Sequence, residues 1–393
     1  MIRTRVDSLL ETKRKNMQDI RYKKNRREFL STSAKSLALL GIALQGGFVF
    51  AKESNKGISS IQHKPMPKRI LGSGKAAMEV SALAFGCMGL NYHRSKKLSK
   101  KEAQNILAQA LDYGITLFDT AQVYGNGSNE ILVGELLKPY KDKIFIATKF
   151  GFGKDADSLD SSPKRIKEVV ENSLKVLHLE QIPLLYQHRA DPKTPIEEVA
   201  GVVADLIQEG KVARFGVCEL NAQSITKAHR ICPLTAVQSE YHLMWRNVES
   251  EIFPTLENLG IGFVAYSPLN RDYLSGTLTK DSKFDVSNDN RATFPRFQPK
   301  ALEANYKIVE LLREFGASKN ASSAQVALAY LLAKKPYIIP LFGTTDSKHL
   351  RENIGALDVS FSASEWQSLD ENVDKIEIVG DRYPPEQAQR VGK

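Results

Sequence analysis

Cysteine is scarce in this chain. Its 393 residues include only Cys87, Cys218 and Cys232. Three cysteines, an odd number spread over a long chain, exclude a fold held together by a disulfide framework. The remaining composition is that of a globular enzyme, and the length suits a single large α/β barrel domain.

Net charge is also nearly absent once the first 51 residues are set aside. The formal charge of the chain is +10, but residues 1–51 hold 11 Lys/Arg against 4 Asp/Glu, which leaves 44 against 41 in the remainder. A body so close to electrical balance gives little support to a nucleic-acid partner.

The basic N-terminal segment lacks a hydrophobic run long enough to span a bilayer, because Leu37 to Phe50 is short and contains glycine and glutamine. Residues 21–53 instead combine a basic front, a modest apolar run and a small residue near the end, which is typical of a targeting segment. Within this segment, Asn25-Arg26-Arg27-Glu28-Phe29-Leu30 resembles the bacterial twin-arginine export motif, and Val49-Phe50-Ala51 resembles a signal-peptidase site.

We therefore predict a twin-arginine signal peptide over residues 1–51, a linker over 52–67 and a catalytic barrel over 68–393. The signal predicts transport by the twin-arginine export machinery, cleavage before Lys52 and a location in the periplasm or cell envelope of a bacterium. A disordered basic tail and an uncleaved anchor are the alternatives. No stable membrane span is expected after cleavage.

A dinucleotide-binding turn is missing as well. No G-x-G-x-x-G follows the first expected strand, so the competing α/β fold, a doubly wound open sheet, lacks its usual cofactor turn. Short apolar segments alternate with helical patterns along the body, which predicts parallel strands in a closed (β/α)8 TIM barrel. The eight expected strands are Ser81–Gly86, Thr116–Phe118, Ile144–Thr148, Ile182–Tyr186, Arg214–Val217, Thr235–Gln238, Phe263–Tyr266 and Ile338–Leu341.

The helices expected between these strands carry apolar residues at the spacing of one helix face. The clearest are Lys100–Tyr113, Pro163–His178, Pro195–Glu209, Asn221–Arg230, Ala301–Phe315 and Ser322–Lys334. An N-terminal hairpin precedes the first strand, and Asp272 to Gln298 is expected to be a long lid or binding loop. Ser362 and Glu365 have capping-box spacing and begin a last helix that runs to about Ile376, after which a C-terminal extension follows.

The stretch from Ile115 to Leu137 organises the candidate site. Its apolar strand ends where Asp119 begins a polar loop that includes Tyr124. The carboxyl end of a strand is the catalytic rim of a barrel. Ser128 or Asn129 is expected to cap the helix that follows.

Lys149 closes the next strand and His188 follows the one after it, so polar side chains come from the carboxyl ends of three neighbouring strands. Each has an ordinary structural explanation: a loop cap for Asp119, a half-buried phenol for Tyr124, a solvated strand end for Lys149, and an imidazole held by Asp191 for His188. Together they make an acid/base site, because an ammonium beside a phenol lowers its pKa from about 10. Asp119 would keep Lys149 charged and aimed, and His188 would hydrogen-bond the substrate oxygen or the phenol.

Many collinear stretches between Arg69 and Tyr383 resemble the aldo-keto reductase family. They are RILGSG with MEVSALAFGCMGL, ITLFDTAQVYGNGSNEILVGELL, IFIATKFG, LLYQHRADPKTPIEEV, QEGKVARFGV, AVQSEYHLMWR, VAYSPL, FPRF and HLRENIGAL. The resemblance implies reduction of an aldehyde or ketone to an alcohol by direct hydride transfer from NADPH, without a metal ion. It makes Tyr124 the general acid, with Asp119, Lys149 and His188 as its tuning partners.

The resemblance also implies residues for the nicotinamide. Tyr266 is expected to stack on the ring and Gln238 to bind its carboxamide. Cys218 and Glu219 occupy the place where relatives often have serine followed by Asn or Glu. Packing at a strand end is the alternative for Cys218, because a thiol is a weak hydrogen-bond donor.

A loop containing Ser267, Leu269 and Arg271 is expected to approach the pyrophosphate of the cofactor. Asp272 follows directly where relatives often have glycine. A carboxylate near phosphates is unfavourable, so Asp272 is expected to turn away or to pair with Arg271.

The adenosine end departs from the family pattern. Relatives commonly read Gly-Thr-Lys-Arg, whereas this chain reads Gly343-Thr344-Thr345-Asp346 and lacks both cations. The cations that remain nearby are Lys348, His349 and Arg351, and Glu352 with Asn353 matches the adenine side of the family. NADPH is the expected cofactor and NADH the alternative.

Five residues are expected to line the substrate pocket: Met88, Tyr92, Phe150, Trp245 and Phe294. Such side chains suit an apolar carbonyl pocket, although they are also ordinary core and rim residues. An exported enzyme would need a way to recycle its cofactor. The alternatives to a reductase are therefore a nucleotide-binding redox sensor and a redox partner of an envelope complex.

Overall fold

The computed structural model describes residues 65–93 and 97–392. The predicted signal peptide, 1–51, and nearly all of the predicted linker, 52–67, lie outside the described residues. Within these described ranges, every helix is too short or too polar to cross a membrane.

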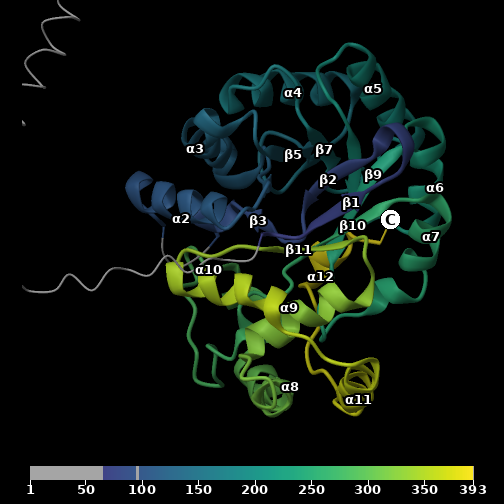
Figure 1. Cartoon of the computed structure of the whole chain (residues 1–393). Coiled ribbons are helices and arrows are strands. Elements are labelled where there is room, and N and C mark those ends of the chain that lie inside the picture. Colours follow the sequence, from purple (N-terminus) through teal and green to yellow (C-terminus); the bar gives the residue numbers. More distant parts are fainter. Residues whose placement is uncertain (1–64, 94–96, 393) are drawn as a thin grey trace, which may run out of the picture. The chain divides into compact units, whose positions relative to one another are not determined.

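Eight parallel strands in the described part of the chain close into a barrel (Figure 1). They are β3 (Ala84–Gly86), β4 (Leu117–Asp119), β5 (Phe145–Phe152), β7 (Leu184–Gln187), β8 (Phe215–Cys218), β9 (Leu234–Glu240), β10 (Gly262–Tyr266) and β11 (Ile338–Phe342). Each pairs with the next along the chain, and β11 returns to pair with β3. The predicted (β/α)8 TIM barrel is confirmed. Each strand is rich in apolar residues on both faces because one face fills the barrel and the other lies under helices.

The helices form the outer layer of the barrel (Figure 1). They are α2 (Lys100–Asp112), α3 (Ser128–Leu137), α4 (Pro163–Leu177), α5 (Ile196–Gln208), α6 (Ala222–Ile231), α7 (Ile252–Leu259), α8 (Pro299–Ala317), α9 (Ser323–Lys334), α10 (Ser347–Ile354) and α11 (Ala363–Asp374). Ser322 and Ser362 form capping boxes at the starts of α9 and α11, as the spacing of Ser362 and Glu365 predicts.

The predicted cap of α3 is wrong. Gly127, with φ 87°, occupies the cap position instead of Ser128 or Asn129. Asn129 is fully buried, and its amide donates to the carbonyl oxygen of Cys87 while its oxygen accepts from Thr120. Asn129 therefore ties the loop after β4 to the end of β3 instead of capping its own helix.

A hairpin covers one end of the barrel. β1 (Lys68–Leu71) pairs antiparallel with β2 (Met78–Ser81), and Leu71 lies opposite Met78. Both side chains are buried among the inward-facing residues of the strands. Gly262 makes this contact possible, because a Cβ there would lie 2.4 Å from a methyl carbon of Leu71.

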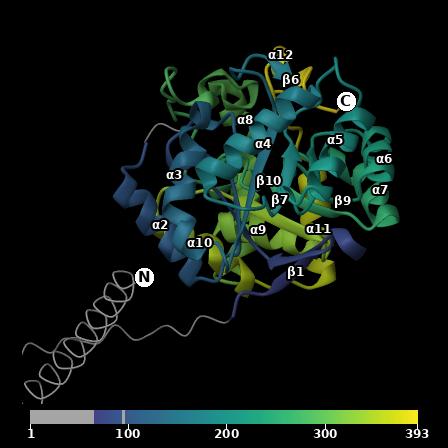
Figure 2. The ribbon, with the colours of Figure 1, turned by 90° about the horizontal axis from the view of Figure 1, so that it is seen from above.

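The other end of the barrel carries the long loop and the C-terminal extension. The loop from 272 to 298 contains three short 3-10 turns, at Tyr273–Ser275, Asn290–Thr293 and Pro295–Phe297. The extension ends in α12 (Pro385–Ala388), which lies at the opposite end of the barrel from β1 (Figure 2). It therefore covers the end to which the strands point.

Candidate active site

Three neighbouring strands bring the four predicted catalytic residues together. Asp119 is the last residue of β4 and lies beside Ala147 of β5. Lys149 lies two residues further along β5, beside Tyr186 of β7, and His188 follows the end of β7. Because the strands are parallel, all of these side chains meet at the same end of the barrel.

Lys149 and Asp119 form a buried ion pair beneath the cavity. The Lys149 ammonium bonds Asp119 Oδ1 and also donates to the carbonyl oxygen of Thr120 at 2.9 Å. Gln238 Nε2 donates to the other oxygen of Asp119 at 2.9 Å, so both carboxylate oxygens are occupied. Burial favours neutral lysine, but the charge and hydrogen bond of Asp119, together with Tyr124 and Cys218, outweigh burial and hold the pKa of Lys149 above its ordinary value.

Tyr124 begins a 3-10 turn after β4, and its ring centroid lies 5.2 Å from the Lys149 ammonium. Lys149 favours the phenolate, in the expected direction, but burial has the larger effect and raises the pKa of Tyr124 to about 12. The expectation of a net lowered pKa therefore fails, because the desolvated phenolate is less stable than the sequence argument assumed. Tyr124 stays protonated at neutral pH and can donate a proton.

His188 packs edge-on against the Tyr124 ring, with their centroids 5.6 Å apart. Burial, and then the charges of Arg189 and Lys149, lower the pKa of His188 well below its ordinary value, so the imidazole is neutral. Asp191 does not hold it, because that carboxylate accepts from the backbone of Ser161 and Lys193. Among the described residues, His188 Nδ1 is buried without a hydrogen-bond partner.

A cavity of about 800 Å³ opens over this group and extends to α10. Asp119, Tyr124 and His188 line it, whereas Lys149 lies beneath it. The predicted cofactor residues that line it are Gln238, Tyr266, Ser267, Leu269, Arg271, Gly343, Thr344, His349, Glu352 and Asn353. Cys218, Glu219 and Lys348 are not among the lining residues.

Three of the five predicted pocket residues line the cavity: Met88, Tyr92 and Phe294. Phe150 does not, because it follows Lys149 in β5 and strand alternation turns it outward into the core beneath the helices. Trp245 lies instead against the guanidinium groups of Arg382 and Arg296, which are 4.9 and 5.6 Å from its ring centroid.

The loop after β10 has an unusual backbone. Ser267, Asn270, Arg271 and Asp272 all have positive φ, from 46° to 77°. A cluster of such strained residues at a cavity is typical of a ligand-binding loop. Asp272 is paired, but its partner is Arg291 at 2.8 Å and not Arg271.

The far end of the cavity carries a carboxylate at the start of α10. Asp346 caps that helix, accepting from the backbone of Lys348 at 2.6 Å and His349 at 3.3 Å. These two hydrogen bonds lower the pKa of Asp346 despite slight burial. Lys348 and Arg351 line a separate hollow, so of these three basic residues only His349 lines the cavity.

Cys218 is buried among the inward-facing residues of the barrel, and burial raises the pKa of its thiol to about 12. This position agrees with the alternative given for Cys218, packing at the end of a strand. Glu219 is occupied by other protein groups: one oxygen accepts from the backbone of Glu240 at 2.8 Å and the other pairs with Arg382 at 2.7 Å.

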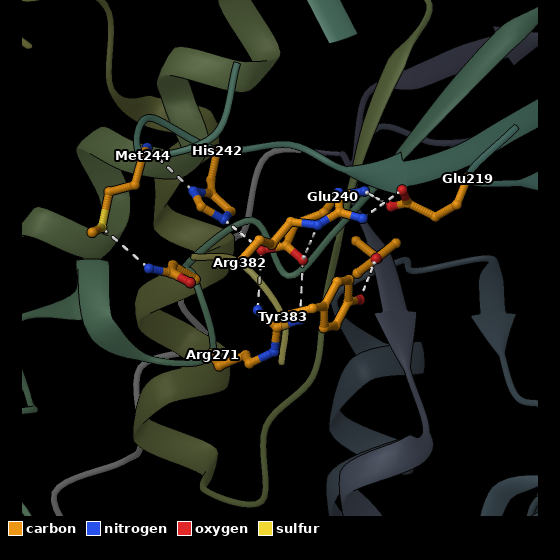
Figure 3. Close-up of polar contacts among 9 residues, drawn as sticks. Glu219, Glu240, His242, Met244, Arg271, Arg382 and Tyr383 are labelled. Atoms are coloured by element: carbon orange, nitrogen blue, oxygen red, sulfur yellow. Dashed lines mark hydrogen bonds and ion pairs between the residues drawn. The ribbon is translucent and has the colours of Figure 1, made fainter. Parts of the chain in front are cut away.

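An ion network joins the C-terminal extension to the strand ends (Figure 3). Arg271 donates to both oxygens of Glu240 at 3.0 Å, and Arg382 pairs with Glu219. Burial alone would raise the pKa of Glu240, but Arg271, His242 and Arg382 together outweigh burial and hold that pKa well below its ordinary value. His242 also contacts Glu240, at 3.0 Å, and burial lowers the pKa of His242 to about 4.

Sequence reasoning missed the residues that the extension contributes. Tyr383, Gln387 and Arg390 line the cavity, and no periodic pattern in that segment signals this position. It also missed Arg189, which lines the cavity and directly follows His188. The adjacency of Arg189 to a predicted catalytic residue was the available signal.

The cavity suits a nicotinamide dinucleotide. It runs from Tyr124 past Tyr266 and the strained loop after β10 to the start of α10. Gly343, in the wall of this cavity, has no room for a side chain, because a Cβ there would lie 2.8 Å from the carbonyl oxygen of Gly86. An elongated site with an acid/base group at one end fits a cofactor whose reactive ring lies beside the proton donor.

Comparison with known proteins gives consistent results. Residues 82–374 match the sequence model of the Aldo/keto reductase family. "Probable aldo-keto reductase 1" from Glycine max is 40% identical over 314 residues, which cover 79% of this chain and 90% of that protein.

Solved structures of similar proteins share the barrel. A glycerol dehydrogenase from Gluconobacter oxydans aligns with a TM-score of 0.71 at 28% identity, over 81% of this chain and 97% of that one. An aldo-keto reductase from Bacillus halodurans, in its holo form, aligns with a TM-score of 0.65 at 25% identity, over 81% and 99%. The family match includes all four predicted catalytic residues and ends before Arg382 and Tyr383.

Proposed function

The chain belongs to the aldo/keto reductase family, and from this premise we propose that it reduces an aldehyde or ketone to an alcohol with Tyr124 as the proton donor. Members of this family are oxidoreductases that act on carbonyl compounds and generally use NAD(P)H.

The dinucleotide would lie along the cavity, with its nicotinamide between Tyr266 and Gln238 and its pyrophosphate near Ser267 and Leu269. When bound in reduced form, it supplies the hydride that adds to the carbonyl carbon. NADPH remains the expected form from the sequence, with NADH as the alternative. Asp346, at the start of α10, bears on that choice.

Tyr124 donates its phenol proton to the carbonyl oxygen as negative charge develops there. The ammonium of Lys149, 5.2 Å from the ring centroid, stabilises the phenolate that remains. Asp119 keeps Lys149 charged and in place. Neutral His188, at the edge of the Tyr124 ring, is placed to hydrogen-bond the same carbonyl oxygen.

One observation carries the proposal: a protonated phenol and a neutral imidazole face a cavity above a buried Lys149–Asp119 ion pair. Burying an ion pair has a large desolvation cost, and this pair contributes little surface to the cavity itself. Its position under Tyr124 is explained if it stabilises charge on the phenol during reaction.

The test is NADPH oxidation by the purified protein with a panel of aldehydes, ketones and quinones, beside a Tyr124→Phe variant. We expect the variant to lose at least about 100-fold in kcat, because general acid catalysis contributes that much or more. Binding of NADPH, followed by fluorescence, should remain close to that of the unmodified protein. Retained turnover would mean that the acid is misassigned, and binding without turnover in either protein would favour a redox sensor or an envelope partner.

We also propose that residues 1–51 are a twin-arginine signal peptide and that the protein is exported to the periplasm or cell envelope of a bacterium. The support is the order of the motif, the apolar run and the cleavage site along the sequence. N-terminal sequencing of the protein from the envelope fraction should give Lys52 as the first residue. A mature protein beginning at Met1 would contradict the proposal.

A further inference from the structure

We propose that Arg189 binds an anionic group of the substrate, a carboxylate or a phosphate, so that the preferred substrate is an anionic aldehyde or ketone. This inference rests on the proposed function, because it concerns the same cavity and the same reaction. It adds a substrate class for this chain.

Arg189 is placed for contact with substrate. It directly follows His188 at the end of β7, is half-buried and lines the same cavity as Tyr124. Its charge acts on both Tyr124 and His188. A group bound by Arg189 and a carbonyl oxygen at Tyr124 can therefore belong to one small molecule.

The guanidinium of Arg189 is largely uncommitted. A guanidinium has five N–H donors, and the described residues provide Arg189 with one acceptor, the carbonyl oxygen of His188 at 2.7 Å from Nη1. Arg189 forms no ion pair within the part of the chain that the structure describes. Guanidinium donors that are free in this way can bind an anionic ligand.

The other arginines that line the cavity have partners of their own. Arg271 is bound to both oxygens of Glu240, and Arg291 pairs with Asp289 and Asp272. Arg390 donates to two backbone carbonyl oxygens, of Ala156 and Asp157. Among these described residues, Arg189 thus retains the most donor capacity for a ligand.

Within the described part of the chain, no carboxylate bonds Arg189 directly. Burial disfavours the charge of Arg189, but Tyr266, Tyr383 and Glu219 together outweigh burial and raise its pKa, so the guanidinium stays charged. The oxygens of Glu219 bond other groups: one accepts from the backbone of Glu240 and the other pairs with Arg382. Asp119 is neutralised by Lys149. The substrate end of the cavity therefore offers a guanidinium to an anion, and a carboxylate or phosphate matches its planar fork best.

The experiment compares aldehydes that differ only in charge. 4-Formylbenzoate is set against 4-formylbenzamide, and glyceraldehyde 3-phosphate against glyceraldehyde, which separates carboxylate from phosphate. For each pair, kcat/KM is measured with the purified protein and saturating NADPH. The dissociation constants of 4-formylbenzoate and 4-formylbenzamide are measured by calorimetry in the presence of NADP, which gives a readout independent of turnover.

We expect at least one anionic member to be preferred over its neutral counterpart by about 10- to 100-fold, the range for a charge-assisted hydrogen bond. Arg189→Gln should remove that preference, and Arg189→Lys should keep part of it because it keeps the charge but not the fork. Arg230→Gln is the matched control. Arg230 is exposed in the last turn of α6, at the end of that helix remote from the strand carboxyl ends, and its loss should leave the preference unchanged.

Two results would overturn the inference. One is equal kcat/KM and equal binding for the charged and neutral members of both pairs. The other is an Arg189→Gln variant whose kcat/KM falls by the same factor for the charged and the neutral member of each pair. A variant that loses only affinity for NADPH would likewise overturn it, because Arg189 would then contact the cofactor. Either result leaves the proposed function in place if the Tyr124→Phe variant is inactive. Charge-selective binding without turnover would instead support the anion site and reject the reductase.

Discussion

The phenol oxygens of Tyr266 and Tyr383 lie 2.7 Å apart, so the C-terminal extension is hydrogen-bonded to the last residue of β10. Tyr266 is the residue expected to stack on the nicotinamide. Tyr383 also packs edge-on against Phe294 of the long loop. Through Tyr383, the extension thus contacts two parts of the cavity wall, the end of β10 and the long loop.

This relationship gives a prediction for stability. Tyr383→Phe should lower the free energy of unfolding by about 1–2 kcal/mol, because it leaves the Tyr266 hydroxyl without its partner. The double variant with Tyr266→Phe should cost less than the sum of the two single changes, because it removes both hydroxyls together. Urea unfolding of the four proteins measures this directly. Strictly additive costs would mean that the two hydroxyls do not stabilise each other.

A larger effect is expected at Glu240, whose side chain is fully buried against Arg271 and His242. Glu240→Gln should lower the free energy of unfolding by about 3–5 kcal/mol at neutral pH, because it leaves Arg271 as a buried, uncompensated charge. Glu257→Gln, at an exposed pair with Lys335, is the matched control and should change stability little.

The same variant has a defined pH dependence. The folded-state pKa of Glu240 lies below its unfolded value, so its stabilising effect is complete above the unfolded pKa. That effect is lost as the pH falls through the folded-state pKa. The difference in unfolding free energy between Glu240→Gln and the unmodified protein should therefore shrink in acid. A constant difference across this range would show that Glu240 is not a depressed carboxylate.

A third prediction concerns the pH profile of carbonyl reduction. Tyr124 has a pKa raised to about 12 and His188 a pKa well below its ordinary value, so neither residue changes its protonation near neutrality. We expect kcat to stay nearly constant between about pH 7 and about pH 9. A loss of activity with a midpoint inside that window would contradict the assigned protonation of one of the two residues.

The sequence predicted the barrel well because every strand is buried on both faces, and such strands appear as short apolar runs between helical patterns. It also located Asp119, Tyr124, Lys149 and His188 at the cavity region, since a residue just beyond a buried strand must lie at the rim. The prediction that Phe150 lines the substrate pocket was wrong because of strand geometry. The next residue in a strand points to the opposite face, so Lys149 and Phe150 cannot both face the site.

Other features could not be predicted from local patterns. The cap of α3 depended on whether the Asn129 side chain would bind its own helix or the carbonyl oxygen of Cys87. The second contact is a tertiary one, and local sequence does not show it. Tyr383 and Arg390 reach the cavity because the extension follows an irregular path across the barrel end. The sign of the Tyr124 pKa shift depended on the depth of burial, which the sequence alone does not give.

The last prediction concerns the choice between NADPH and NADH. Asp346 places a carboxylate at the start of α10, where the family resemblance implies a cation, and Lys348 and Arg351 line a different hollow. A carboxylate repels the 2′-phosphate of NADPH, whereas it can accept a hydrogen bond from the 2′-hydroxyl of NADH. Asp346→Asn should therefore increase the affinity for NADPH relative to NADH by about 10-fold, equivalent to removing roughly 1.4 kcal/mol of repulsion. The asparagine can still cap α10, so helix stability should change little.

The measurement is the dissociation constant of each cofactor by fluorescence, for the unmodified protein and the variant. Asp142→Asn, an exposed change in the segment that precedes β5, is the control and should leave the ratio of the two constants unchanged. If Asp346→Asn changes the affinity for both cofactors equally, the carboxylate does not face the 2′ position, and the choice of cofactor must be made elsewhere in the cavity. If the unmodified protein already binds NADH more tightly, Asp346 explains that preference, and the expectation of NADPH drawn from the family resemblance is wrong.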